Sequence, residues 1–139
     1  MKIVILDGNA LNPGDLSWDG FKQLGDVTLF DRTPKDLVVQ RIGDAEILIT
    51  NKVTITREIL NQCPNLKYIG VLATGYNIID TKACTEKSIV VTNIPSYSTS
   101  AVAQAVFAYI LEYTNGVHSH NISVQKGDWC SSKDFCYWT

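Results

Sequence analysis

The chain has 139 residues, of which 12 are basic and 14 acidic, so its formal net charge is −2. This length fits one ordinary domain with a real core, and no block of like charges suggests contact with nucleic acid or a membrane surface. No apolar stretch could span a bilayer, the amino terminus does not resemble a signal peptide, and the four cysteines suggest neither a zinc site nor a disulfide scaffold. We therefore expect a soluble, cytoplasmic protein with reduced thiols and no nucleic-acid or membrane partner.

Short apolar runs alternate with segments of helical spacing along the first hundred residues. The predicted strands are 2–6, 27–30, 46–50, 67–72 and 89–92. The predicted helices are 16–24, 33–41, 56–62 and 79–87. Thr33 is expected to cap the second helix, with Pro34 at its first position and Gly43 after its end. Because parallel strands need helical crossovers, this order predicts an α/β fold with a flavodoxin-like, doubly wound, parallel five-stranded sheet and helices on both faces.

The pattern changes after Pro95, where a polar stretch leads into one long predicted helix from Ala101 to about Gln125. Such a helix is longer than the sheet requires, so we expect it to leave the domain and meet a second domain or a partner subunit. The chain thus divides into a domain at 1–100 and a helix with an aromatic tail at 101–139. If nothing covers that part, we expect exposed apolar side chains that drive association, namely Val102, Val106, Phe107, Ile110, Trp129 and Trp138.

Three predicted strands end in turns that could carry chemistry, at residues 7–9, 50–52 and 73–75. The carboxyl ends of parallel strands meet at one edge of the sheet, where open α/β folds bind ligands. Gly75 would let backbone N–H groups approach a small anion, and Lys52 would add a positive charge suited to a carboxylate or phosphate. Two plainer interpretations stay open: Gly75 only turns the chain, and Lys52 is a solvated loop residue. Asn51 either contacts the ligand or is an ordinary turn former.

Other kinds of site find little support in the sequence. His118 and His120 lie two apart on the predicted long helix, so they point to different faces and cannot share a metal ion. No serine stands in a Gly-x-Ser-x-Gly elbow, and no cysteine has a nearby histidine. Asp7 stands alone after the first strand, whereas a phosphoacceptor receiver would carry an acidic cluster there.

Several blocks in fixed order resemble those of one enzyme family. The blocks are TNKVTIT from residue 50, PNLKYIGVLATGYNIID from 64, VVTNIPSYSTSAVAQ from 90, QKGDW from 125 and DFCYW from 134. Together they resemble the D-2-hydroxy-acid dehydrogenases, most closely the glycerate dehydrogenase or hydroxypyruvate reductase branch. The resemblance covers nearly the whole chain, and ordered blocks are more specific than any single motif.

The resemblance implies a two-domain oxidoreductase in which this substrate domain precedes a Rossmann domain that binds NAD(H) or NADP(H). The implied reaction is hydride transfer between the nicotinamide and a small 2-hydroxy or 2-oxo acid, such as hydroxypyruvate or glyoxylate. The sequence contains no Gly-x-Gly-x-x-Gly, and the family's catalytic Arg, Glu and His are expected beyond Thr139. We therefore assign no catalytic residue here, and we expect the chain alone to be inactive and to bind no cofactor.

The resemblance also assigns roles to individual residues of the substrate site. The backbone N–H groups of Thr74 and Gly75 match the positions that hold the substrate carboxylate, and Asn51 and Lys52 match the loop that flanks the substrate. This implied site coincides with the strand-end site inferred from the residues themselves.

The start of the long helix has an implied role as well. Thr99 and Val102 match positions that face the nicotinamide, whereas Gln104 stands where many members carry Glu. The helix resembles the family's crossing helix and homodimer interface. The alternative reading is a non-catalytic module that dimerises or binds small carboxylates.

Overall fold

The computed structural model describes residues 1–134 and 136 of the chain. It divides into two compact units, one comprising Met1–Ser96 and a second beginning at Tyr97. Within the described residues, no helix combines the length and apolar character needed to cross a bilayer.

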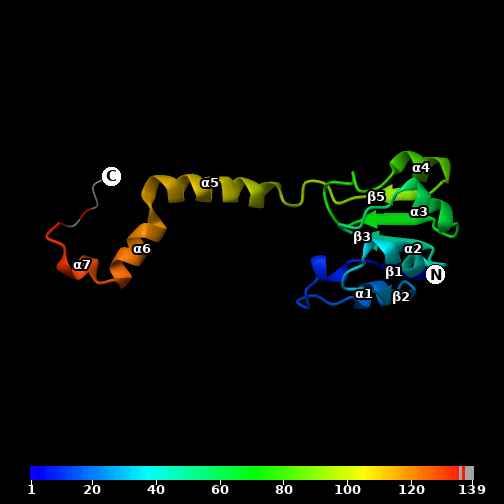
Figure 1. The fold of residues 1–139 in the computed structure, drawn as a ribbon, viewed down its shortest axis with the longest axis horizontal. Helices are drawn as coiled ribbons and strands as arrows, with labels where there is room; N and C mark the ends of the chain where they lie inside the picture. Colours follow the sequence, from blue (N-terminus) through cyan, green and yellow to red (C-terminus); the bar gives the residue numbers. More distant parts are fainter. Residues whose placement is uncertain (135, 137–139) are drawn as a thin grey trace. The chain divides into compact units, whose positions relative to one another are not determined.

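The first unit is built on a parallel sheet of five strands (Figure 1). The strands are β1 Lys2–Ile5, β2 Asp26–Leu29, β3 Ile47–Thr50, β4 Tyr68–Val71 and β5 Val90–Thr92. Their order across the sheet is β2-β1-β3-β4-β5, and every neighbouring pair is parallel. This order is that of doubly wound, flavodoxin-like sheets, so the predicted fold class is confirmed.

Short helices connect the strands. They are the 3-10 turns η1 Gly8–Ala10 and η2 Lys35–Leu37, and the helices α1 Asp19–Lys22, α2 Val38–Ile42, α3 Arg57–Gln62 and α4 Thr81–Glu86. The best-defined start is that of α4, where the Asp80 side chain accepts a hydrogen bond of 2.8 Å from the Ala83 N–H. A carboxylate at this position satisfies a backbone donor that the helix itself leaves unpaired.

The two faces of the sheet are covered unequally. Helices α2, α3 and α4 pack on one face and contribute to the larger core, to which the strands add residues such as Val4, Leu48 and Ile69. The side chains that alternate with these point to the other face, where Ile3, Ile5 and Ile49 form a smaller cluster next to α1. That second face also carries a mainly apolar groove over β3, β4 and β5, with a volume of about 360 Å³.

Two details of the predicted helices in this unit are wrong. Thr33 does not cap a helix, because Pro34 is extended with ψ of 150° and the first helical turn begins only at Lys35. The Thr33 hydroxyl instead donates to the backbone oxygen of Leu6. The helix expected at 16–24 is confined to α1, because the Asn12 side chain bonds the backbone of Gly14 and Leu16 and holds the chain in a loop.

The second unit contains helices α5 Thr99–Asn115, α6 Val117–Gln125 and α7 Asp128–Ser131. The prediction of one helix from Ala101 to about Gln125 is wrong, because Gly116 adopts the left-handed conformation with φ of 55° and ψ of 39°. The Gly116 N–H donates to the backbone oxygen of Glu112 at 2.8 Å, and this ends α5 in the manner typical of glycine.

The apolar side chains expected to be exposed in the second unit are exposed where they are described. Val102, Val106, Phe107, Ile110 and Trp129 each expose at least half of their surface. Trp138 lies outside the described residues. No residue of α5 is buried, so this helix has an unpartnered apolar surface.

Candidate functional site

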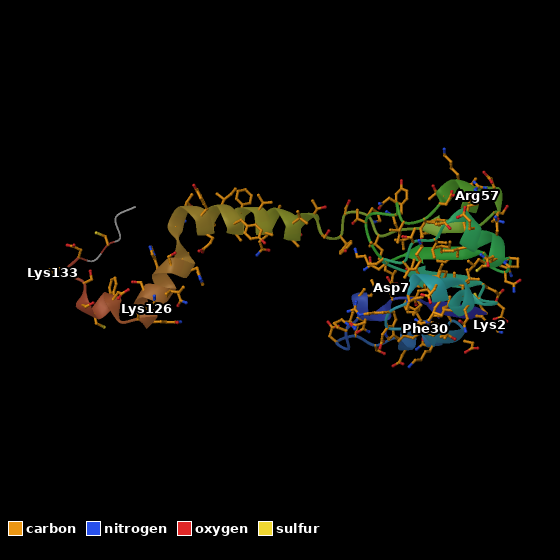
Figure 2. The ribbon with its side chains drawn as sticks, viewed as in Figure 1. Lys2, Asp7, Phe30, Arg57, Lys126 and Lys133 are labelled. Carbon is orange, nitrogen blue, oxygen red and sulfur yellow. The ribbon has the colours of Figure 1, made fainter. Side chains whose placement is uncertain are left out.

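The candidate site lies where β1, β3 and β4 end. The register pairs Ile5 with Ile49 and Thr50 with Val71. The Leu72 N–H also donates to the backbone oxygen of Thr50 at 2.9 Å. These pairings bring the ends of the three strands to one edge of the sheet. Figure 2 labels Asp7 at this edge, and Lys2 at the other end of β1.

The loop at residues 50–53 is held by the protein itself. Asp7 follows β1, is only 5% exposed, and accepts hydrogen bonds from the backbone N–H groups of Asn51 and Lys52. The Asn51 nitrogen lies 3.0 Å from each carboxylate oxygen, and the Lys52 nitrogen lies 2.5 Å from Oδ2. The Thr50 hydroxyl oxygen lies 3.3 Å from the Val53 nitrogen and accepts from it. This loop therefore offers a ligand its side chains and not its N–H groups.

Two side chains of this loop carry a polar group that the described residues leave without a partner. The Oδ1 atom of Asn51 is buried and has no hydrogen-bond partner within residues 1–134 and 136. An acceptor in that state costs about 1–3 kcal/mol until a donor reaches it. Lys52 is exposed and forms no ion pair with any described residue. The loop thus contains one buried acceptor without a donor and one exposed positive charge without an ion-pair partner.

The loop that follows β4 uses its groups in the opposite way. The backbone oxygen of Ala73 accepts from the Ile94 N–H at 3.0 Å, and the backbone oxygen of Thr74 accepts from Asn93 Nδ2 at 2.8 Å. The Thr74 hydroxyl donates to the Ile94 oxygen at 3.2 Å. By contrast, the N–H groups of Thr74 and Gly75 donate to no acceptor in the described part of the chain. Carbonyl groups tie this loop to the segment after β5, and its N–H groups remain open to a ligand.

The backbone of Gly75 does not adopt a conformation that requires glycine. The glycines with positive φ are Gly14, Gly43, Gly116 and Gly127, so Gly75 is absent from this group. A Cβ atom added at Gly75 would meet only Asn77 Oδ1, at 3.4 Å. Thr74 and Gly75 are both exposed. The interpretation of Gly75 as a residue needed only to turn the chain therefore has no support in its backbone angles.

Perturbed titratable groups lie away from this edge. Burial raises the pKa of the Cys63 and Cys84 thiols, and the hydrogen bond from Arg57 lowers the pKa of Glu86. All four cysteines are free, and no group of three or more candidate ligands for a metal ion occurs in the described residues. An exposed lysine beside open N–H groups can bind and orient an anion.

Thr99 and Val102, the predicted cofactor-facing residues, lie in the first turn of α5. They belong to the second unit, and both are exposed. The sequence predicted that four candidate substrate-site residues lie at neighbouring strand ends, but it did not identify Asp7 as the residue that fixes one of the loops. The available signal was an isolated carboxylate directly after the apolar run of β1.

Comparison with known proteins shows which family the chain belongs to. A family model described as the catalytic domain of D-isomer specific 2-hydroxyacid dehydrogenases matches residues 3–127. The chain belongs to this family. Among curated relatives, a hydroxypyruvate reductase from Blautia hydrogenotrophica is 48% identical over 141 residues, which is 99% of this chain and 44% of the relative. A glycerate dehydrogenase from Methylorubrum extorquens is 37% identical, over 76% of this chain and 33% of the relative. The resemblance inferred from the sequence blocks is therefore confirmed.

Solved structures agree with this family assignment. An acyclic imino acid reductase in complex with NADPH and D-Arg has a TM-score of 0.75 at 30% identity, covering 91% of this chain and 41% of that one. A 2-hydroxyacid dehydrogenase from Ketogulonicigenium vulgare has a TM-score of 0.73 at 26% identity, covering 97% and 42%. The chain spans less than half the length of these relatives and solved structures.

Proposed function

We propose that this chain forms the substrate-binding part of an NAD(P)-dependent oxidoreductase that interconverts a small 2-hydroxy acid and its 2-oxo acid, of the hydroxypyruvate or glyoxylate type. The observation that carries the proposal is the pair of open N–H groups at Thr74 and Gly75 on the loop after β4, together with the unpaired charge of Lys52 on the loop after the neighbouring strand β3. The names of the relatives support the reaction class.

In this proposal the two loops divide the work of binding. The N–H groups of Thr74 and Gly75 donate to the substrate carboxylate, and the Lys52 ammonium adds attraction for its negative charge. The unfilled Asn51 Oδ1 accepts from a hydroxyl group of the substrate, which a 2-hydroxy acid carries and which hydroxypyruvate carries on its third carbon. These contacts fix the substrate carbon that gains or loses hydride.

We also propose that most of the residues that bind the cofactor belong to another part of the complete protein. The sequence of this chain has no glycine-rich dinucleotide fingerprint. When bound in the complete protein, the nicotinamide nucleotide supplies or accepts the hydride. We propose that Thr99 and Val102 face it there, and that α5 crosses between domains and contributes to a homodimer.

The first test is a ligand titration of the 139-residue chain. Addition of hydroxypyruvate or glyoxylate should shift the amide signals of Asn51, Lys52, Thr74 and Gly75 in ¹H–¹⁵N spectra. Propionate, which has a carboxylate but no oxygen on its second carbon, measures the contribution of the carboxylate alone. Absence of shifts at these residues at millimolar ligand would overturn the assignment of the substrate site.

The second test addresses the reaction. Residues 1–139 should replace the matching part of the Blautia hydroxypyruvate reductase, to which they are 48% identical. The chimera should oxidise NADH or NADPH with hydroxypyruvate, and the 139-residue chain alone should not. A folded chimera that is silent across a panel of 2-oxo acids, combined with retained ligand binding by the chain, would favour the alternative of a non-catalytic carboxylate-binding module.

A further inference from the structure

The strand-end edge contains one buried charged side chain that the proposed binding scheme does not use. Asp7 is only 5% exposed, and Asn12 and Thr50 are the other buried polar residues in the described part of the chain. No described lysine or arginine forms an ion pair with Asp7. A buried carboxylate without a cationic partner is costly unless hydrogen bonds compensate for the lost hydration.

Among residues 1–134 and 136, the hydrogen bonds to the Asp7 side chain come from one short segment. The N–H groups of Asn51 and Lys52 both donate to Asp7, at 2.5–3.0 Å. Asp7 lies 44 and 45 residues away from them in the chain, so the contact bridges the ends of the neighbouring strands β1 and β3. Hydrogen bonds that involve an ionised group are stronger than those between neutral groups.

We propose that Asp7 is a positioning residue for ligand binding: it fixes the backbone of Asn51 and Lys52, and thereby the two side chains that face an anionic ligand. This inference rests on the proposed function, because it concerns the same ligand. Asp7 does not contact the ligand in this scheme. By taking both N–H groups, it sets the direction in which the side chains of these residues leave the backbone.

Removal of the Asp7 carboxylate should change the affinity for an anion in opposite directions, according to whether Asp7 acts through its charge or through the position of the loop. If Asp7 acted through its charge alone, its removal would take away a repulsion and strengthen the binding of an anion. If Asp7 acts through position, its removal weakens binding although the site becomes more positive. The direction of the change in Kd therefore separates the two explanations.

The variant to use is Asp7→Asn in the 139-residue chain, because it keeps the shape of the side chain. One amide oxygen can still accept from Asn51, but the amide NH₂ group then meets the Lys52 N–H as a second donor. We expect the Kd for hydroxypyruvate, followed at the Thr74 and Gly75 amides, to rise about tenfold, the result of losing one charge-assisted hydrogen bond.

A matched control is available at Asn12. This residue is 8% exposed, and its Oδ1 accepts from the N–H groups of Gly14 at 3.0 Å and Leu16 at 2.9 Å. Asn12→Ala thus removes, from a different loop, another buried side chain that accepts two backbone hydrogen bonds. It should lower stability without changing the Kd, whereas a purely structural role of Asp7 would make the two variants behave alike.

Amide hydrogen exchange of the unmodified chain gives a readout that needs neither ligand nor variant. The N–H groups of Asn51 and Lys52 should exchange slowly, and those of Thr74 and Gly75 fast. Equal rates at the two loops would overturn the inference, as would an unchanged or lower Kd in folded Asp7→Asn. Failure of the unmodified chain to bind hydroxypyruvate would instead overturn the proposed function, while the exchange rates would still decide whether Asp7 fixes the loop.

Discussion

The loops after β3 and β4 lie next to each other at the same edge, yet they satisfy their backbone groups in opposite ways. In the first, the N–H groups of Asn51, Lys52 and Val53 bond to side chains of the protein. In the second, the carbonyl oxygens of Ala73 and Thr74 are bonded and the N–H groups of Thr74 and Gly75 are open. One loop is thus fixed by the fold and carries an unpaired charge, and the other leaves two backbone N–H dipoles open.

This difference follows from the segment that each loop faces. The first faces Asp7, a carboxylate placed at the end of the adjacent strand β1. The second faces the segment after β5, which offers the Asn93 amide and the Ile94 N–H as donors. A donor-rich neighbour occupies carbonyl groups, and an acceptor-rich neighbour occupies N–H groups.

The largest expected effect concerns the stability of the fixed loop. Asp7→Ala leaves the N–H groups of Asn51 and Lys52 without their acceptor, and we expect the free energy of unfolding to fall by about 2–4 kcal/mol. Urea denaturation followed by circular dichroism measures this change. Asp15→Ala removes an exposed carboxylate as a control and should stay within about 0.5 kcal/mol. Equal effects of the two variants would show that the first loop is not held as described.

The next effect concerns the charge of the fixed loop. Lys52→Met keeps the length of the side chain and removes its charge, so the Kd for hydroxypyruvate should rise about tenfold with little change in stability. The measurement is the titration of the Thr74 and Gly75 amides. Lys35→Met, at an exposed lysine of η2, serves as the control. A Kd unchanged by Lys52→Met would leave the second loop as the whole site.

The sequence was sufficient to predict the sheet and the residues at its edge, because apolar strands and their polar ends follow from local periodicity. It was not sufficient for the division of labour between the loops. That depends on Asp7 reaching Asn51 and Lys52, a contact across 44 and 45 residues that no local pattern encodes. The break at Gly116 was missed for another reason: the chain is helical on both sides of it, and the left-handed backbone of Gly116 separates α5 from α6.

A smaller effect concerns access to the open loop. Gly75→Ala adds a methyl group where only Asn77 Oδ1 lies near, at 3.4 Å, so the fold should tolerate it within about 0.5 kcal/mol. The same methyl group crowds a ligand that approaches the N–H groups, and the Kd should rise about threefold to fivefold. Gly20→Ala, where a Cβ meets nothing within 4 Å, is the matched control. A large loss of stability with Gly75→Ala would mean that Gly75 has a structural role instead.

The smallest effect separates charge from dipoles within the site. The Lys52 charge is exposed and is therefore screened by salt, whereas hydrogen bonds from the Thr74 and Gly75 N–H groups at short range depend little on ionic strength. Raising NaCl from about 50 to 500 mM should increase the Kd of the unmodified chain about twofold to threefold. In Lys52→Met the remaining affinity should be nearly independent of salt. The same salt dependence in both proteins would contradict the assignment of charge to one loop and dipoles to the other.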